Sequence, residues 1–137
     1  MSAEWLFIRD VTKIDFEEKS TLLARAWHEG NRLPGYVSSN GRVGHFAHEG
    51  QVLEKQSEFE IFNGGSHIFW KPHRIGHDLH SDAFQVGKTV QNEPLFVGRL
   101  RINGTNVYGQ VRGNAVCYVV VNQEIREVQT FDLLLCN

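Results

Sequence analysis

The chain contains two copies of one sequence unit. Pairs of matching residues recur at one constant separation, 99 − 25 = 74: Arg25/Arg99, Gly30/Gly104, Gly35/Gly109 and Val37/Val111. Further along, the separation falls to 72, as in the pair Glu60 and Asp132, so one two-residue deletion accounts for the step. Repeats at a fixed period indicate supersecondary units that pack around a shared core. Two copies favour one pseudo-twofold domain over an open solenoid, which needs about three or more repeats.

Length, charge and cysteine content limit the class of protein. A chain of 137 residues suits a single domain over residues 1–137. The net charge of −2 argues against nucleic acid as a partner, and no apolar run approaches the roughly 20 residues of a membrane span. The first residues lack the pattern of a secretory signal, which predicts a cytoplasmic protein, with unconventional secretion as the alternative. Cys117 and Cys136 are too few for a disulfide framework.

Turn signals and alternating apolar residues predict β-strands throughout. Asn103-Gly104, between two apolar runs, is typical of a type I′ hairpin turn. In the first copy we expect a hairpin that turns at residues 29–31, with its second strand broken by Pro34-Gly35. Residues 63–66 are predicted to be a turn and the histidine-rich stretch 67–89 to be irregular. Further strands are expected at residues 41–47, 56–62, 115–121 and 129–135.

The resulting fold class is all-β, a sandwich or barrel-like domain made of two pseudo-symmetric repeats. Each repeat is expected to start at a tryptophan, so repeat I covers residues 5–62 and repeat II covers residues 70–135. Trp5 and Trp70 would then have the same place in the two copies.

The repeated pattern resembles the DM-nine repeat family. Each unit reads tryptophan, apolar-apolar-x-arginine, a glycine five residues later, a second glycine five beyond it, and a final Phe-acidic-Ile/Leu strand. The segments 95–99 and 131–134 are close to the family's forms. The resemblance implies a non-enzymatic lectin without a cofactor. The characterised lectin members of the family bind mannose-type sugars, act in pattern recognition in innate immunity, and are commonly homodimers.

The resemblance also implies site residues. The family holds its sugar with an aspartate ten residues before the repeat's arginine, which falls on Asp15, and with a lysine after the second glycine, where this chain has Tyr36. The turn residues His28 and Glu29, and Arg25 on the strand below, are further candidates. The pseudo-equivalent positions of the second copy are Thr89, Gln110 and Arg99.

These residues also have structural interpretations. Tyr36 has the character of a core aromatic, and Asp15 that of a surface carboxylate. The recurrence of arginine in both copies equally suits two buried ion pairs. A tyrosine in place of lysine would change the sugar preference by packing its ring on the sugar's C–H face.

A second cluster contains His67, His73, His77 and His80, with Asp78. Imidazoles and a carboxylate can bind zinc or nickel, but Pro72 and Gly76 argue against the helix that a His-x-x-x-His zinc motif needs. We expect solvated loop histidines and only adventitious metal binding. A protein-interaction module that has lost sugar binding is the main alternative to a lectin, and a metal-dependent hydrolase is a weaker one.

Overall fold

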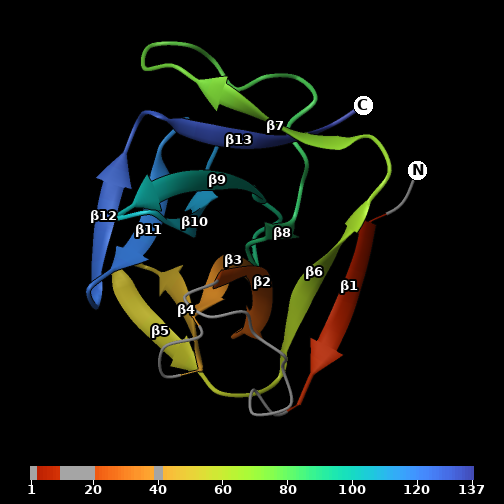
Figure 1. Cartoon of the computed structure of the whole chain (residues 1–137), viewed down its shortest axis with the longest axis vertical. Helices are drawn as coiled ribbons and strands as arrows, with labels where there is room; N and C mark the ends of the chain where they lie inside the picture. The colour runs from red at the N-terminus through yellow and green to blue at the C-terminus, as the bar shows by residue number, and fades with distance from the viewer. Residues whose placement is uncertain (1–2, 10–20, 39–41) are drawn as a thin grey trace.

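A computed structural model describes residues 3–9, 21–38 and 42–137, and regular structure within these ranges is entirely β (Figure 1). Asp15 lies outside the described residues. The strands are β1 (Ala3–Ile8), β2 (Thr21–His28), β3 (Asn31–Ser38), β4 (Val43–His48), β5 (Gln51–Lys55), β6 (Phe59–Gly65), β7 (Ile68–His73), β8 (Gly87–Lys88), β9 (Pro94–Ile102), β10 (Thr105–Val111), β11 (Cys117–Val121), β12 (Glu124–Val128) and β13 (Phe131–Cys136).

The two repeats form sheets with the same antiparallel order. In repeat I the strands lie side by side as β1-β6-β2-β3-β4-β5. In repeat II the order is β7-β13-β9-β10-β11-β12. The first strand of each repeat therefore pairs with its last, which places Trp5 opposite Phe62 and Trp70 opposite Leu134. The short strand β8 pairs with both β3 and β9, so the whole is one continuous sheet folded on itself.

The folded sheet is sandwich-like and does not close into a barrel. Strand β10 of repeat II packs against β2, β3 and β4 of repeat I, and β5 lies against β12. One apolar cluster lies within repeat I, around Phe46 and Phe59. A second, around Val111 and Phe131, belongs to repeat II but also takes in Tyr36 of repeat I. The strands confirm the all-β fold class, and Tyr36 joins the cores of the two repeats.

Both expected hairpins are confirmed. Asn103 and Gly104 have φ values of 50° and 80°, and Glu29 and Gly30 have 49° and 83°, the left-handed pair that a type I′ turn requires. The expected break at Pro34-Gly35 is wrong, because β3 runs through both residues with Gly35 paired to Ala24 on one side and to Phe46 on the other.

Other boundaries also differ from expectation. Asn63 to Gly65 continue β6, and the turn falls one step later, where His67 has a φ of 62°. The stretch expected to be irregular begins with strand β7. Strands β5 and β12 were not predicted, because each carries charged residues on a largely exposed edge and lacks a continuous apolar run.

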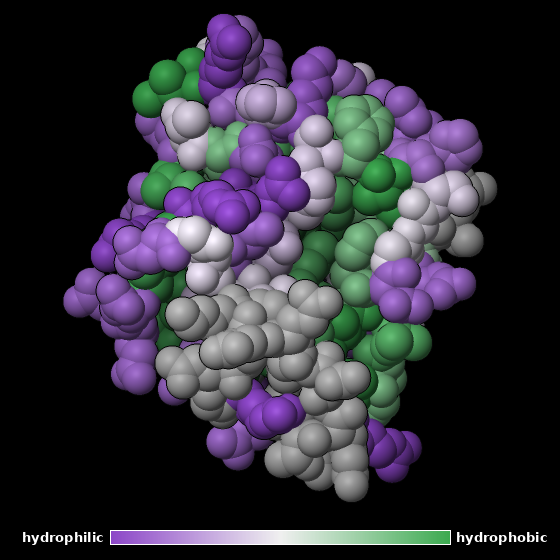
Figure 2. All heavy atoms as spheres, viewed as in Figure 1, coloured by the Kyte–Doolittle hydropathy of each residue, from purple (hydrophilic) through white to green (hydrophobic). Residues whose placement is uncertain are grey.

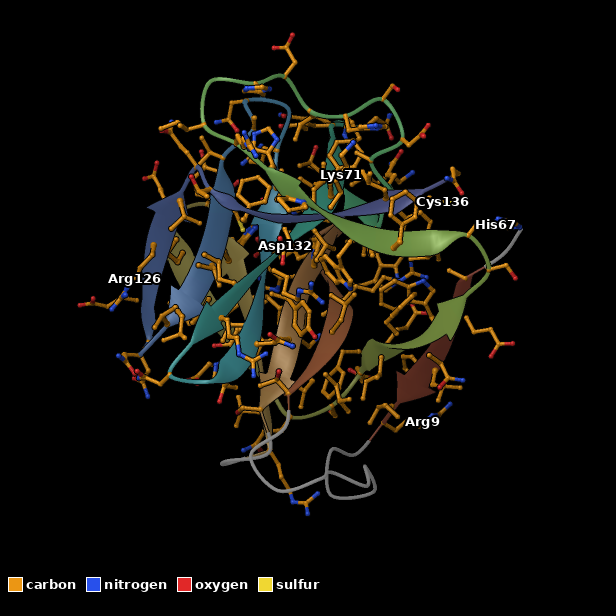
Figure 3. All side chains as sticks on the ribbon, turned by 45° about the horizontal axis from the view of Figure 1, so that its top comes forward. Arg9, His67, Lys71, Arg126, Asp132 and Cys136 are labelled. Carbon is orange, nitrogen blue, oxygen red and sulfur yellow. The ribbon has the colours of Figure 1, made fainter. Side chains whose placement is uncertain are left out.

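Each repeat contains the same assembly of arginine, tryptophan and acid. The guanidinium carbon of Arg25 lies 4.0 Å from the centre of the Trp5 ring, and its Nε donates to Glu60 Oε1 at 3.0 Å. In repeat II the Arg99 guanidinium lies 4.5 Å from the Trp70 ring, and its terminal nitrogen is 3.0 Å from Oδ2 of Asp132, which Figure 3 labels.

Cross-strand register explains why this assembly recurs. Arg25 lies directly opposite Glu60, and Arg99 directly opposite Asp132. Burial lowers the pKa of Arg25, an effect that the hydrogen bond and charge of Glu60 oppose. Both arginines therefore form ion pairs, as the structural interpretation of their recurrence predicted.

Candidate functional site

The residue after the second glycine of each repeat reaches across to the other repeat. Tyr36 Oη donates to the Val120 carbonyl at 2.5 Å, and Gln110 Nε2 donates to the Ala47 carbonyl at 3.1 Å. Both side chains are buried, at 7% and 5% exposure. Equivalent positions thus lie where the two repeats meet, one on each side of the pseudo-twofold axis.

Tyr36 takes a core role in this arrangement. Its ring centre lies 5.1 Å from that of His45, and burial raises the pKa of its phenol. With the ring covered and the hydroxyl donating to a carbonyl, Tyr36 does not present the face that stacking on a sugar requires. The burial supports the core interpretation of Tyr36 over a ligand contact, and its proposed partner Asp15 lies outside the described residues.

In the second copy, two of the three expected residues lie in one place. Thr89 and Gln110 line one pocket of about 90 Å³, with His48, Glu49 and Arg112 among its other walls. A neighbouring pocket of about 250 Å³ shares Gln110, Glu49 and Arg112 and extends to Tyr118 and Glu127. We call the two pockets together the inter-repeat crevice. Arg99 is not among the residues that line it.

Two polar residues of the inter-repeat crevice, Arg112 and Thr89, are both held by Glu93. Arg112 Nε donates to Glu93 Oε2 at 3.0 Å, and Thr89 Oγ1 accepts from the Glu93 backbone amide at 3.0 Å. The hydrogen bond from Arg112 lowers the pKa of Glu93, and the same contact raises the pKa of Arg112. Arg112 and Thr89 therefore line the crevice in positions that Glu93 fixes from behind, because Glu93 itself is not among the lining residues.

The effect of Arg112 on Glu93 is directly testable. In Arg112→Gln, the Glu93 pKa should rise toward its ordinary value of 4.5. Because the lowered pKa stabilises the fold above pH 4.5, and this contribution is lost as the pH falls through the lowered pKa, the variant should also lose less stability on acidification. An NMR titration of the side-chain carboxyl measures the first effect. Arg126→Gln, on exposed β12, is the control, and an unchanged Glu93 pKa in Arg112→Gln would contradict the assignment.

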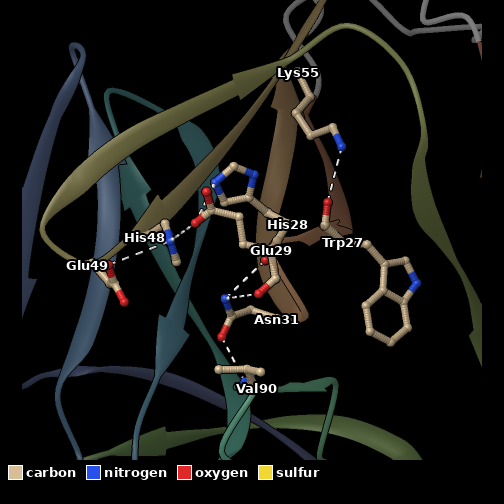
Figure 4. A network of polar contacts seen from close by, with 8 residues as sticks. All are labelled: Trp27, His28, Glu29, Asn31, His48, Glu49, Lys55 and Val90. Carbon is tan, nitrogen blue, oxygen red and sulfur yellow. Dashed lines mark hydrogen bonds and ion pairs between the residues drawn. The ribbon is translucent and has the colours of Figure 1, made fainter.

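His28 and Glu29 lie beside this crevice and meet a third residue, His48 (Figure 4). Glu29 Oε2 is 3.3 Å from His48 Nε2 and 3.7 Å from His28 Nε2. The two imidazole rings meet edge to face, with centres 4.7 Å apart. Among the first-copy candidates that the structure describes, His28 and Glu29 are brought together, whereas Arg25 is held against Trp5 and Glu60.

Sequence reasoning missed His48 and Glu49, although a signal was present. The tripeptide His-Glu-Gly occurs at residues 28–30 and again at 48–50. Both copies form left-handed turns, since Glu49 and Gly50 have φ values of 48° and 76°. Pairing of β3 with β4 brings the two turns together. Glu93 and Arg112 gave no such signal, because they are 19 residues apart and meet only through the fold.

The histidine-rich loop forms a different cavity. His73, His77 and His80 line a hollow of about 410 Å³. His73 is buried and stacks on Phe131 at 4.9 Å, and burial together with His77 lowers its pKa. The expectation of solvated histidines is therefore wrong for His73 and right for His77 and His80, which are exposed. Within the described part of the chain, the ligand atoms of this cluster do not converge as those of His28, Glu29 and His48 do.

Comparisons with known proteins address the chain as a whole. A comparison with curated proteins gives no match. In the described ranges there is no helix of the length and hydropathy needed to cross a membrane. The family model of the DM9 repeat matches residues 15–127, which includes the repeated arginines and glycines and the inter-repeat crevice. This match covers most of the chain, which therefore belongs to the DM9 repeat family.

Proposed function

We propose that this protein is a non-enzymatic recognition protein that binds mannose-type sugars in the inter-repeat crevice. The DM9 repeat family is known as carbohydrate-binding and lectin-like. The observation that carries the proposal is that Thr89 and Gln110, the positions where the family's sugar-binding residues would stand in the second repeat, line one pocket.

The chemistry of the crevice suits a monosaccharide. A hexose presents neighbouring hydroxyls that both donate and accept, so it is oriented by a carboxylate and a fixed donor placed close together. Arg112, fixed by Glu93, supplies the donor, and Glu49, which lines both pockets with it, supplies a carboxylate. The two pockets are also small beside the roughly 300–1,000 Å³ typical of drug-sized ligands.

An amide-shift titration with mannose and a panel of hexoses tests the proposal. Shifts are expected at Thr89, Gln110 and Arg112. Hydrogen bonds to charged groups contribute about 1.5–3 kcal/mol, so Arg112→Gln should weaken binding about tenfold or more. Arg126→Gln, an exposed change on β12, is the matched control and should leave binding unchanged.

Two further results distinguish a sugar site in the first repeat from one in the crevice, and a lectin from a protein-interaction module. Loss of binding in Asp15→Asn alone would place the sugar in the first repeat. If no hexose shifts any amide at tens of millimolar, the sugar-binding proposal is wrong, and a protein-interaction module becomes the better reading of the same fold.

Weak single sites would gain from multivalency, so we also propose a homodimer. The exposed residues Leu6 and Phe7 lie on β1, which pairs only with β6 among the described strands and so leaves one edge available. Figure 2 shows hydrophobic residues gathered on the side of the molecule where β1 and β6 lie. Self-association, residence in the cytoplasm and absence of catalysis remain predictions.

A further inference from the structure

We propose that His28, Glu29 and His48 form a binding site for a divalent metal ion of the zinc type. Among the described residues, this is the one group of histidine, cysteine and acidic side chains whose ligand atoms converge, all lying within 4.8 Å of one another. The proposed metal site does not depend on the proposed sugar binding.

Two of the three distances between ligand atoms are close to those in a tetrahedral site. Zinc binds imidazole nitrogen and carboxylate oxygen at about 2.0–2.2 Å, which places neighbouring ligand atoms roughly 3.3 Å apart. Glu29 Oε2 is 3.3 Å from His48 Nε2 and 3.7 Å from His28 Nε2. The ligand atoms of His28 and His48 lie within 4.8 Å of each other, so rotation of the side chains would bring all three ligand atoms to one ion.

The backbone beneath these side chains is held by Asn31. This residue is 7% exposed, and its Nδ2 donates to the carbonyls of His28 at 3.0 Å and Glu29 at 3.3 Å. Its Oδ1 accepts from the Val90 amide at 2.8 Å (Figure 4). The turn that carries two of the ligands is thus fixed before an ion arrives, which lowers the entropic cost of binding.

The donor set selects the class of metal. Two imidazoles and one carboxylate suit zinc, nickel and copper, whereas magnesium and calcium prefer oxygen ligands alone. Glu49 lies close by, with Oε2 3.8 Å from His48 Nε2, and can supply a fourth ligand in place of water. Access is open, since the Glu29 side chain is 71% exposed and that of His28 is 31% exposed.

Binding would join two turns of repeat I at the border of the crevice. His28 ends β2, Glu29 lies in the β2–β3 turn, and His48 ends β4. His48 also lines the crevice. An ion here would stabilise the folded protein by mass action, because the unfolded chain does not hold the three ligands together.

The test uses untagged, metal-free protein titrated with Zn²⁺ against a chromophoric chelator, in the absence of sugar. One equivalent should bind with micromolar or tighter affinity, and Co²⁺ should give the intense visible absorption of a tetrahedral site. His28→Ala and His48→Ala should each weaken binding about tenfold or more, and Glu29→Gln should also weaken it. His77→Ala and His80→Ala are matched controls on the histidine-rich loop and should change nothing.

Amide spectra of each variant establish whether the fold is kept, and His28→Ala and Glu29→Gln serve as the more exposed changes because the His48 side chain is only 14% exposed. Binding that survives in both His28→Ala and His48→Ala, or that is lost in His77→Ala, would overturn the proposal. Absence of any stoichiometric binding to the wild-type protein would overturn it equally. Since sugar is absent throughout, failure here leaves the lectin proposal to its own titration.

Discussion

Gly35→Ala is expected to lower the free energy of unfolding by about 3 kcal/mol or more. A Cβ atom at this position would lie 2.2 Å from the His45 carbonyl oxygen and 2.6 Å from Cδ1 of Phe46. The nearest atom belongs to the backbone of the paired strand β4, so relief requires the strands themselves to move apart. Urea unfolding followed by tryptophan fluorescence measures the change.

Gly109→Ala is the equivalent change in repeat II. Its Cβ would meet the Tyr118 carbonyl at 2.6 Å and Cys117 Sγ at 2.7 Å, so we expect a loss of similar origin but smaller size. Gly113→Ala is the matched control, because no atom lies within 4 Å of its Cβ, and it should stay within about 0.5 kcal/mol of wild type. Equal stabilities of Gly35→Ala and Gly113→Ala would refute the steric explanation for the repeated glycine.

The features that sequence reasoning predicted well depend on local chemistry. Asn103-Gly104 forms its turn because these two residues tolerate positive φ, which needs no knowledge of distant contacts. The repeat itself shows which residues have equivalent places, and Arg25 and Arg99 indeed make equivalent ion pairs. Strands β5 and β12 were missed because pairing with a neighbour, and not their own hydrophobicity, makes them strands.

The candidate site was harder to predict because the burial of its side chains depends on how the two repeats pack against each other. Tyr36 looks available in the sequence, but its hydroxyl meets a carbonyl 84 residues away, which only the packing of the two repeats brings near. Thr89 and Gln110 came from resemblance, and the fold brings both into one pocket. His48 joins His28 through strand pairing, so the repeated His-Glu-Gly becomes informative once β3 and β4 are known to be neighbours.

The second large effect concerns the paired arginines. Arg25→Met should destabilise the protein by about 3 kcal/mol, because it removes the partner of a largely buried carboxylate while keeping the apolar stem. The Arg25 and Glu60 side chains are only 14% and 22% exposed. Arg25 also donates to the Val86 carbonyl at 2.9 Å, which ties repeat I to the segment before β8.

Arg99→Met provides the matched comparison within the same chain. The side chains of Arg99 and Asp132 are 28% and 37% exposed, so water screens this pair more and compensates Asp132 when the arginine is removed. We expect a loss of about 1–2 kcal/mol, measured by urea unfolding under the same conditions. If Arg99→Met lowered the free energy of unfolding as much as Arg25→Met, solvent exposure would not determine the strength of the two ion pairs. The stacking of each arginine on its tryptophan would then be the dominant contribution.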